Sequence, residues 1–177
     1  MKRINLKINN ISYQGGFTFI ELLLYLAIVT IMMTALIPFA WNTIESGVKS
    51  STEQEVFSNA RYISEQIAYQ IRNASGINSV SATSISLVTA ISSTNPTVIG
   101  LSGSSLTMKQ GVGSPINLNS QNASISALTF TNYTSSDNKT KNIQFIFTVS
   151  ANFSGAGKRQ EYNESTSIES SAEVRSN

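Results

Sequence analysis

The sequence predicts an α+β fold in which a long N-terminal helix, hydrophobic in its first half, packs by its second half on an antiparallel β-sheet. Two observations predict this fold. An uncharged apolar run, Leu22 to Trp41, continues into a segment whose apolar residues recur every three or four positions. From Ile77 onward this period stops, and short alternating apolar stretches separated by turn residues replace it.

A short basic leader, residues 1–16, comes first. It contains Lys2, Arg3 and Lys7 and no acidic residue, so the positive-inside rule keeps it in the cytoplasm. The apolar run that follows rises about 30 Å as a helix, the thickness of a bilayer core. We therefore expect a single pass through a membrane, with the N-terminus inside and the head outside.

A basic start followed by an apolar run is also typical of secretory signal peptides and of uncleaved membrane anchors. A secretory signal peptide has a shorter apolar region, about 7–15 residues, followed by a cleavage site between small residues. The stretch after the run, Pro38-Phe39-Ala40-Trp41, offers no convincing site of that kind. An uncleaved membrane anchor is the second alternative.

One helix is expected from about Thr18 to Ser75, with Gly76 as its C-cap. Residues 17–41 form its membrane or assembly part and residues 42–76 its amphipathic part. Pro38 removes one backbone donor, so it should kink or locally melt the helix near Thr34. The kink is either simply tolerated in a membrane helix or serves as a hinge. The expected buried face comprises Ile44, Val48, Val56, Ala60, Ile63, Ile67, Ile71 and Ala74.

Residues 77–177 are expected to form a β-rich head. In Ile143, Phe145, Phe147 and Val149 every second residue is apolar, which gives one strand a buried face that the amphipathic half-helix would cover. After a flexible joint at residues 154–157, the polar segment 155–177 is either a hairpin strand or a frayed tail. The candidate strands are Ser84–Thr89, Thr97–Leu101, Ser105–Lys109, Ile125–Thr131, Asn142–Val149 and, weakly, Ser165–Val174, with turn signals at Asn95-Pro96, Gly111-Val112-Gly113 and residues 135–138.

The composition argues against catalysis. The chain has no histidine and no cysteine, so the commonest general base, the commonest metal ligand and the thiol nucleophile are all missing. Between Glu65 and Glu161 the only carboxylate is Asp137, which rules out a carboxylate pair there. We expect no enzyme, no cofactor, no metal site and no disulfide. Without its leader the chain carries nine basic and ten acidic residues, so direct nucleic-acid binding is not implied.

The junction of leader and apolar run reads Gly15-Gly16-Phe17-Thr18-Phe19-Ile20-Glu21. This stretch resembles the processing motif of prepilins, the precursors of type IV pilins and of pseudopilins. The resemblance implies that a prepilin peptidase cuts between Gly16 and Phe17 and methylates the new amino group of Phe17. It also implies a pilin-like fold, and Pro38 matches a proline of the family.

Glu21 has two possible roles. Thr18 and Glu21 have the spacing of a capping box, and a carboxylate at a helix start complements the helix dipole. However, a carboxylate beside a membrane-spanning run is costly unless it is paired. In the resembling family the matching glutamate neutralises the N-terminal amine of a neighbouring subunit during assembly, and the same role is expected for Glu21.

The resemblance thus implies a minor pilin or pseudopilin that is stored in the inner membrane and then incorporated into an extracytoplasmic filament of a type IV pilus, a type II secretion system or a DNA-uptake machine. Its partners would be the prepilin peptidase, other pilin or pseudopilin subunits, the inner-membrane assembly platform and, before assembly, lipid. Residues Ile67 to Ile77 weakly resemble the helix end of J-type pseudopilins and W-type minor pilins. A major pilin and a membrane-anchored adhesion or binding module that never polymerises remain alternatives.

Overall fold

The computed structural model describes residues 15–137, 139–152 and 163–175 of the chain. The chain divides into two compact units, Met1–Thr43 and Ile44–Asn177. A single helix, α1 (Phe19–Asn73), contributes to both units. The leader expected at residues 1–16 and the joint expected at residues 154–157 lie largely outside the described residues.

The expected helix is present, and its ends differ slightly from the prediction. It begins at Phe19 and ends at Asn73. Gly76 is not its C-cap, because Gly76 is already the first residue of a strand. The helix also continues through Pro38 without a break, so the expected local melting is not observed, and the kink itself stays a prediction.

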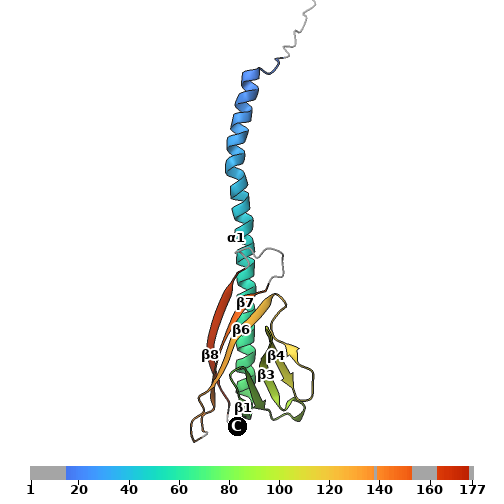
Figure 1. Ribbon diagram of the computed structural model, residues 1–177, viewed down its shortest axis with the longest axis vertical. Helices are drawn as coiled ribbons and strands as arrows, with labels where there is room; N and C mark the ends of the chain where they lie inside the picture. The colour runs from blue at the N-terminus through green and yellow to red at the C-terminus, as the bar shows by residue number, and fades with distance from the viewer. Residues whose placement is uncertain (1–14, 138, 153–162, 176–177) are drawn as a thin grey trace, which may run out of the picture. The chain divides into compact units, whose positions relative to one another are not determined.

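The second unit contains two antiparallel sheets instead of the single sheet that the sequence predicted (Figure 1). The first has the order β1-β2-β3-β4-β5 and the second the order β6-β7-β8. The strands are β1 (Gly76–Val80), β2 (Ser84–Val88), β3 (Thr97–Ser102), β4 (Ser105–Gln110), β5 (Ile116–Asn117), β6 (Ala123–Asn132), β7 (Asn142–Ala151) and β8 (Ser165–Glu173), and a short 3-10 turn, η1 (Ser92–Thr94), precedes β3.

Six of these strands were predicted, and two were not. The polar C-terminal segment forms β8, which pairs with β7 over its whole length, so the hairpin alternative is right for residues 165–173. The turn after β4 also follows its signal. Gly111 there has a φ of 54°, and a side chain at this position would collide with the carbonyl oxygen of Ser93, so the turn requires glycine.

One core holds the second unit together. The buried face of α1 and the inner faces of both sheets contribute to a single apolar cluster. Phe145 and Phe147 of β7 are fully buried in it, as are Ile63, Ile67 and Ile71 of α1. The expected contact face was wrong at its start, because Ile44 is 64% exposed and burial on α1 begins at Thr52. The spacing of apolar residues reveals an apolar helix face, but it does not show at which residue the sheets begin to cover that face.

Candidate functional site

The start of α1 lies next to the glycine pair. Gly15 to Thr18 are not helical, and α1 begins directly after them. A Cβ atom added at Gly15 or Gly16 would meet nothing within 4 Å. The peptide bond between Gly16 and Phe17 is thus in a non-helical, accessible stretch, as a protease requires.

Thr18 caps the helix, as its spacing from Glu21 predicts. The backbone N–H of Glu21 donates to the Thr18 hydroxyl over 3.3 Å, and the N–H of Leu22 donates to the Thr18 carbonyl over 3.2 Å. Only this half of the capping box is formed. Within residues 15–137, 139–152 and 163–175, no hydrogen bond or ion pair reaches the Glu21 carboxylate. The cap therefore uses the Glu21 backbone and leaves the charged group available.

The side chains around this carboxylate are exposed and apolar. Phe17 is 75% exposed, and its ring meets the Tyr25 ring edge-on at a centroid distance of 6.0 Å. Every residue from Phe17 to Thr43 is exposed within its unit. Between Gly15 and Trp41, Glu21 is the only charged residue. A water-exposed surface of this kind is unfavourable, so this half of α1 requires lipid or other protein around it.

Length and composition make α1 capable of spanning a membrane. Its most apolar window of 18 residues has a mean hydropathy of 2.4. The threonines of the apolar run present no free hydroxyl donor: Thr30 and Thr34 each donate to the carbonyl four residues earlier, over 2.7 and 2.8 Å. Such internal bonds let a hydroxyl enter hydrocarbon without an unsatisfied donor. Trp41 at the end of the run has the position typical of an interfacial aromatic residue.

The second unit offers no comparable chemistry in its described residues. No group of three or more histidine, cysteine or acidic side chains is close enough to hold a metal ion in the described part of the chain. Asp137 is confined to an exposed turn, where bonds from the Ser135 hydroxyl and the Lys139 N–H lower its pKa.

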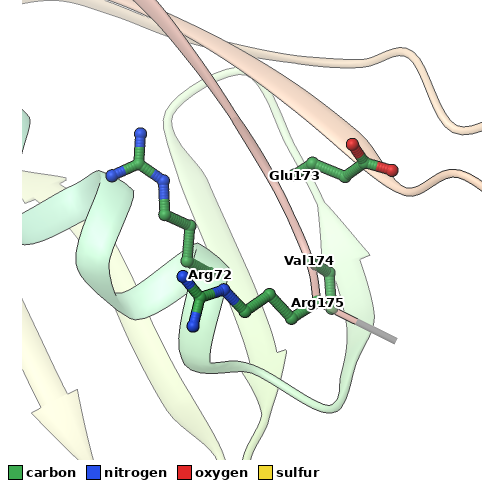
Figure 2. Close-up of a pocket in the computed structure, with 4 residues that line it drawn as sticks. All are labelled: Arg72, Glu173, Val174 and Arg175. Atoms are coloured by element: carbon green, nitrogen blue, oxygen red, sulfur yellow. The ribbon is translucent and has the colours of Figure 1, made fainter. Parts of the chain in front are cut away.

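An open pocket of about 340 Å³ lies where α1 ends, lined by Arg72, Glu173, Val174 and Arg175. Figure 2 shows the Glu173 side chain directed away from the two guanidinium groups. All three charged residues are exposed, and Glu173 is the single carboxylate among the lining residues, without a second acid–base group beside it in the pocket. This arrangement supports no catalytic role.

The comparisons with known proteins point to the same N-terminal region. Residues 11–37 match a family described as the prokaryotic N-terminal methylation motif. No curated protein and no solved structure matches the chain significantly. The matched segment includes Gly16, Phe17 and Glu21 and ends one residue before Pro38.

Proposed function

Because its N-terminal methylation motif makes this chain a member of the type IV prepilin and pseudopilin family, we propose that it is a minor pilin or pseudopilin that acts in the assembly of an extracytoplasmic filament. Proteins with this motif are structural subunits, not enzymes, and the motif implies processing by a prepilin peptidase and assembly with other pilins. The finer proposal is that this subunit helps to initiate a filament and is not its abundant shaft protein. The lack of cysteine supports it, because the head cannot form the C-terminal disulfide loop that many major pilins have.

One observation carries the proposal: an exposed apolar half-helix that contains a single carboxylate, Glu21, four residues after Phe17. Cleavage after Gly16 creates a positive amino group on Phe17. In a filament of packed apolar helices, a carboxylate without a cation would be strongly unfavourable. We propose that Glu21 pairs with the Phe17 amine of a neighbouring subunit.

Before assembly, the same half-helix would be stored in the inner membrane, with lipid in place of the neighbouring subunits. The basic leader orients it with the N-terminus inside and the head outside. Extraction would then require the assembly platform. Pro38 would act there as a kink or hinge, because its missing N–H weakens the helix at one turn.

The test replaces Glu21 with valine in the native host. Membrane insertion and cleavage depend on charge asymmetry and hydrophobicity, so the Glu21→Val protein should still be processed and found in the membrane. Its amount in sheared filaments should be at least tenfold lower than that of the unaltered protein. Glu53→Val, which removes an exposed carboxylate from the second unit, is the matched control and should incorporate normally.

Normal incorporation of Glu21→Val would mean that the Glu21 carboxylate is not needed for assembly and serves only the start of the helix. Absence of the unaltered protein from every filament would contradict assembly altogether and favour a membrane-anchored binding module. If the unaltered protein were the main component of the shaft, it would be a major pilin.

A further inference from the structure

The outer edge of β8 is long and regular, and within the described residues it is bonded only just past its C-terminal end, where the N–H of Arg175 donates to the Arg72 carbonyl over 3.4 Å. A sheet edge has backbone N–H and C=O groups without a partner strand, so it can pair with another chain, and proteins usually blunt it. Here β1 has five residues and an irregular register, and β5 has two residues. On β6, a residue with positive φ, Ala127, interrupts the register.

The β6 edge is also covered by the first sheet. The N–H of Ile125 donates to the Ser104 carbonyl over 2.8 Å, and the N–H of Phe130 donates to the Ala82 carbonyl over 2.9 Å. By contrast, β8 is the terminal strand in the order β6-β7-β8, and Figure 1 shows it along the outer side of that sheet. It has nine residues in unbroken register with β7 and contains no proline, glycine or lysine.

The register shows which backbone groups of β8 face outward. The N–H of Ala151 donates to the Glu164 carbonyl, and the N–H of Val174 donates to the Lys141 carbonyl, each over 2.8 to 2.9 Å. In an antiparallel pair, hydrogen-bonded residues alternate with residues whose backbone groups point the other way. The even-numbered residues from 164 to 174 therefore bond to β7. The backbone groups of Ser165, Ser167, Glu169, Ser171 and Glu173 point to the free edge.

The side chains of these same residues lie on the solvent face of the sheet and are exposed. Two of them, Glu169 and Glu173, are acidic. Neither forms an ion pair within the described residues, although Glu169 accepts a hydrogen bond from Gln144 over 2.6 Å. Opposite charges across a strand pair stabilise it, and like charges destabilise it. Pairing of β8 with β8 of a second copy would bring acidic strands together, so a basic partner strand is favoured.

We propose that the free edge of β8 binds an extended segment of a different subunit, which adds a strand to the β6-β7-β8 sheet and places lysine or arginine opposite Glu169 and Glu173. The source of that segment, a neighbouring subunit in the filament, rests on the proposed function. The backbone bonds of the free edge provide the attachment, and the two carboxylates select the partner.

The first experiment tests the edge alone, on the full chain in detergent micelles. Its probe is a nine-residue peptide that alternates lysine with threonine, and its control is the same peptide with glutamate in place of lysine. Without peptide, amide hydrogen exchange should be slow at Ile168 and Ser170 and fast at Ser167 and Ser171. The lysine peptide should slow exchange at Ser167 and Ser171 at least tenfold, and the glutamate peptide should not.

Two variants test the mechanism of binding. Ser171→Pro removes only an N–H that faces the free edge, so β8 should remain paired with β7 while binding of the lysine peptide is lost. Ser171→Ala keeps that N–H and should bind normally. Glu169→Lys should reduce binding of the lysine peptide and improve binding of the glutamate peptide. Slow exchange at Ser167 and Ser171 in the free chain, or equal protection by both peptides, would overturn the proposal.

The second experiment measures incorporation into filaments in the native host. Ser171→Pro should be excluded at least tenfold, and Ser171→Ala should incorporate like the unaltered protein. If Ser171→Pro incorporates normally, the edge does not bind a filament subunit, and the proposed function is unaffected. If neither the unaltered protein nor Ser171→Ala incorporates, the proposed function fails, and the peptide experiment still decides on the edge.

Discussion

At the scale of single residues, two kinds of apolar side chain on α1 differ in what surrounds them. Ile67 is fully buried in the core, whereas Tyr69, two positions later, is 60% exposed. Residues from Phe17 to Thr43 are all exposed. The same helix therefore has side chains that its own chain covers and side chains that only a membrane or another subunit can cover.

Ile67→Ala tests the first kind. The substitution leaves a cavity in the core, so the free energy of unfolding should fall by about 2–5 kcal/mol, a large part of the roughly 5–15 kcal/mol typical of a domain. Urea unfolding of the full chain in detergent micelles, followed by circular dichroism, measures the change. Tyr69→Ala is the matched control and should change stability by about 0.5 kcal/mol or less. Equal effects of the two variants would mean that this helix face does not support the sheets.

At the scale of elements, a polar cluster joins α1 to the segment between β5 and β6. The N–H of Ser120 donates to the Asn59 side-chain carbonyl over 2.9 Å, and the Ser120 hydroxyl donates to the Glu55 carboxylate over 2.7 Å. The Asn59 amide group also donates to Glu55 over 3.1 Å. Helix and connecting segment thus satisfy each other's polar groups at the margin of the core.

Asn59→Ala should therefore weaken the attachment of α1. It leaves the half-buried Ser120 N–H without its acceptor, so stability should fall by about 1–3 kcal/mol in the same urea experiment. Ser58→Ala, at the exposed neighbouring position, should have little effect. The cluster would be energetically unimportant if both variants unfolded at the same urea concentration.

Periodicity predicted those elements whose side chains follow a clear pattern. The helix and six of the eight strands, including β7 with its buried Phe145 and Phe147, were predicted for that reason. The strands β1 and β5 were missed because β1 has an irregular register and β5 has only two residues. The split into two sheets was also missed, since alternation within a strand does not identify the strand beside it. The Asn59 and Ser120 contact, 61 positions apart, leaves no local pattern in the sequence.

At the scale of the whole molecule, the division after Thr43 separates a unit with its own apolar core from a unit whose described apolar side chains are exposed. The N-terminal candidate site could be proposed from the sequence because its residues form one contiguous motif, Gly16 to Glu21, inside the matched segment, and the roles of these residues stay predictions. The free edge of β8 could not be predicted, because the sequence does not show the order of strands in a sheet and therefore does not show which strand is the last.

Processing of the N-terminus is the prediction that concerns the whole chain. The mature protein should begin at Phe17, so the intact mass of membrane-extracted protein from the native host should lack Met1 to Gly16 and include one added methyl group. Gly16→Val should leave the precursor uncut. Because a Cβ atom at Gly16 meets nothing within 4 Å, the substitution should not disturb the fold, and the loss of cleavage would reflect recognition by the peptidase. Gly15→Val, where a Cβ atom is equally unhindered, is the control for added bulk beside the motif and should still be cut. Full-length protein in assembled filaments would contradict processing at Gly16, and with it the free Phe17 amine on which pairing with Glu21 depends.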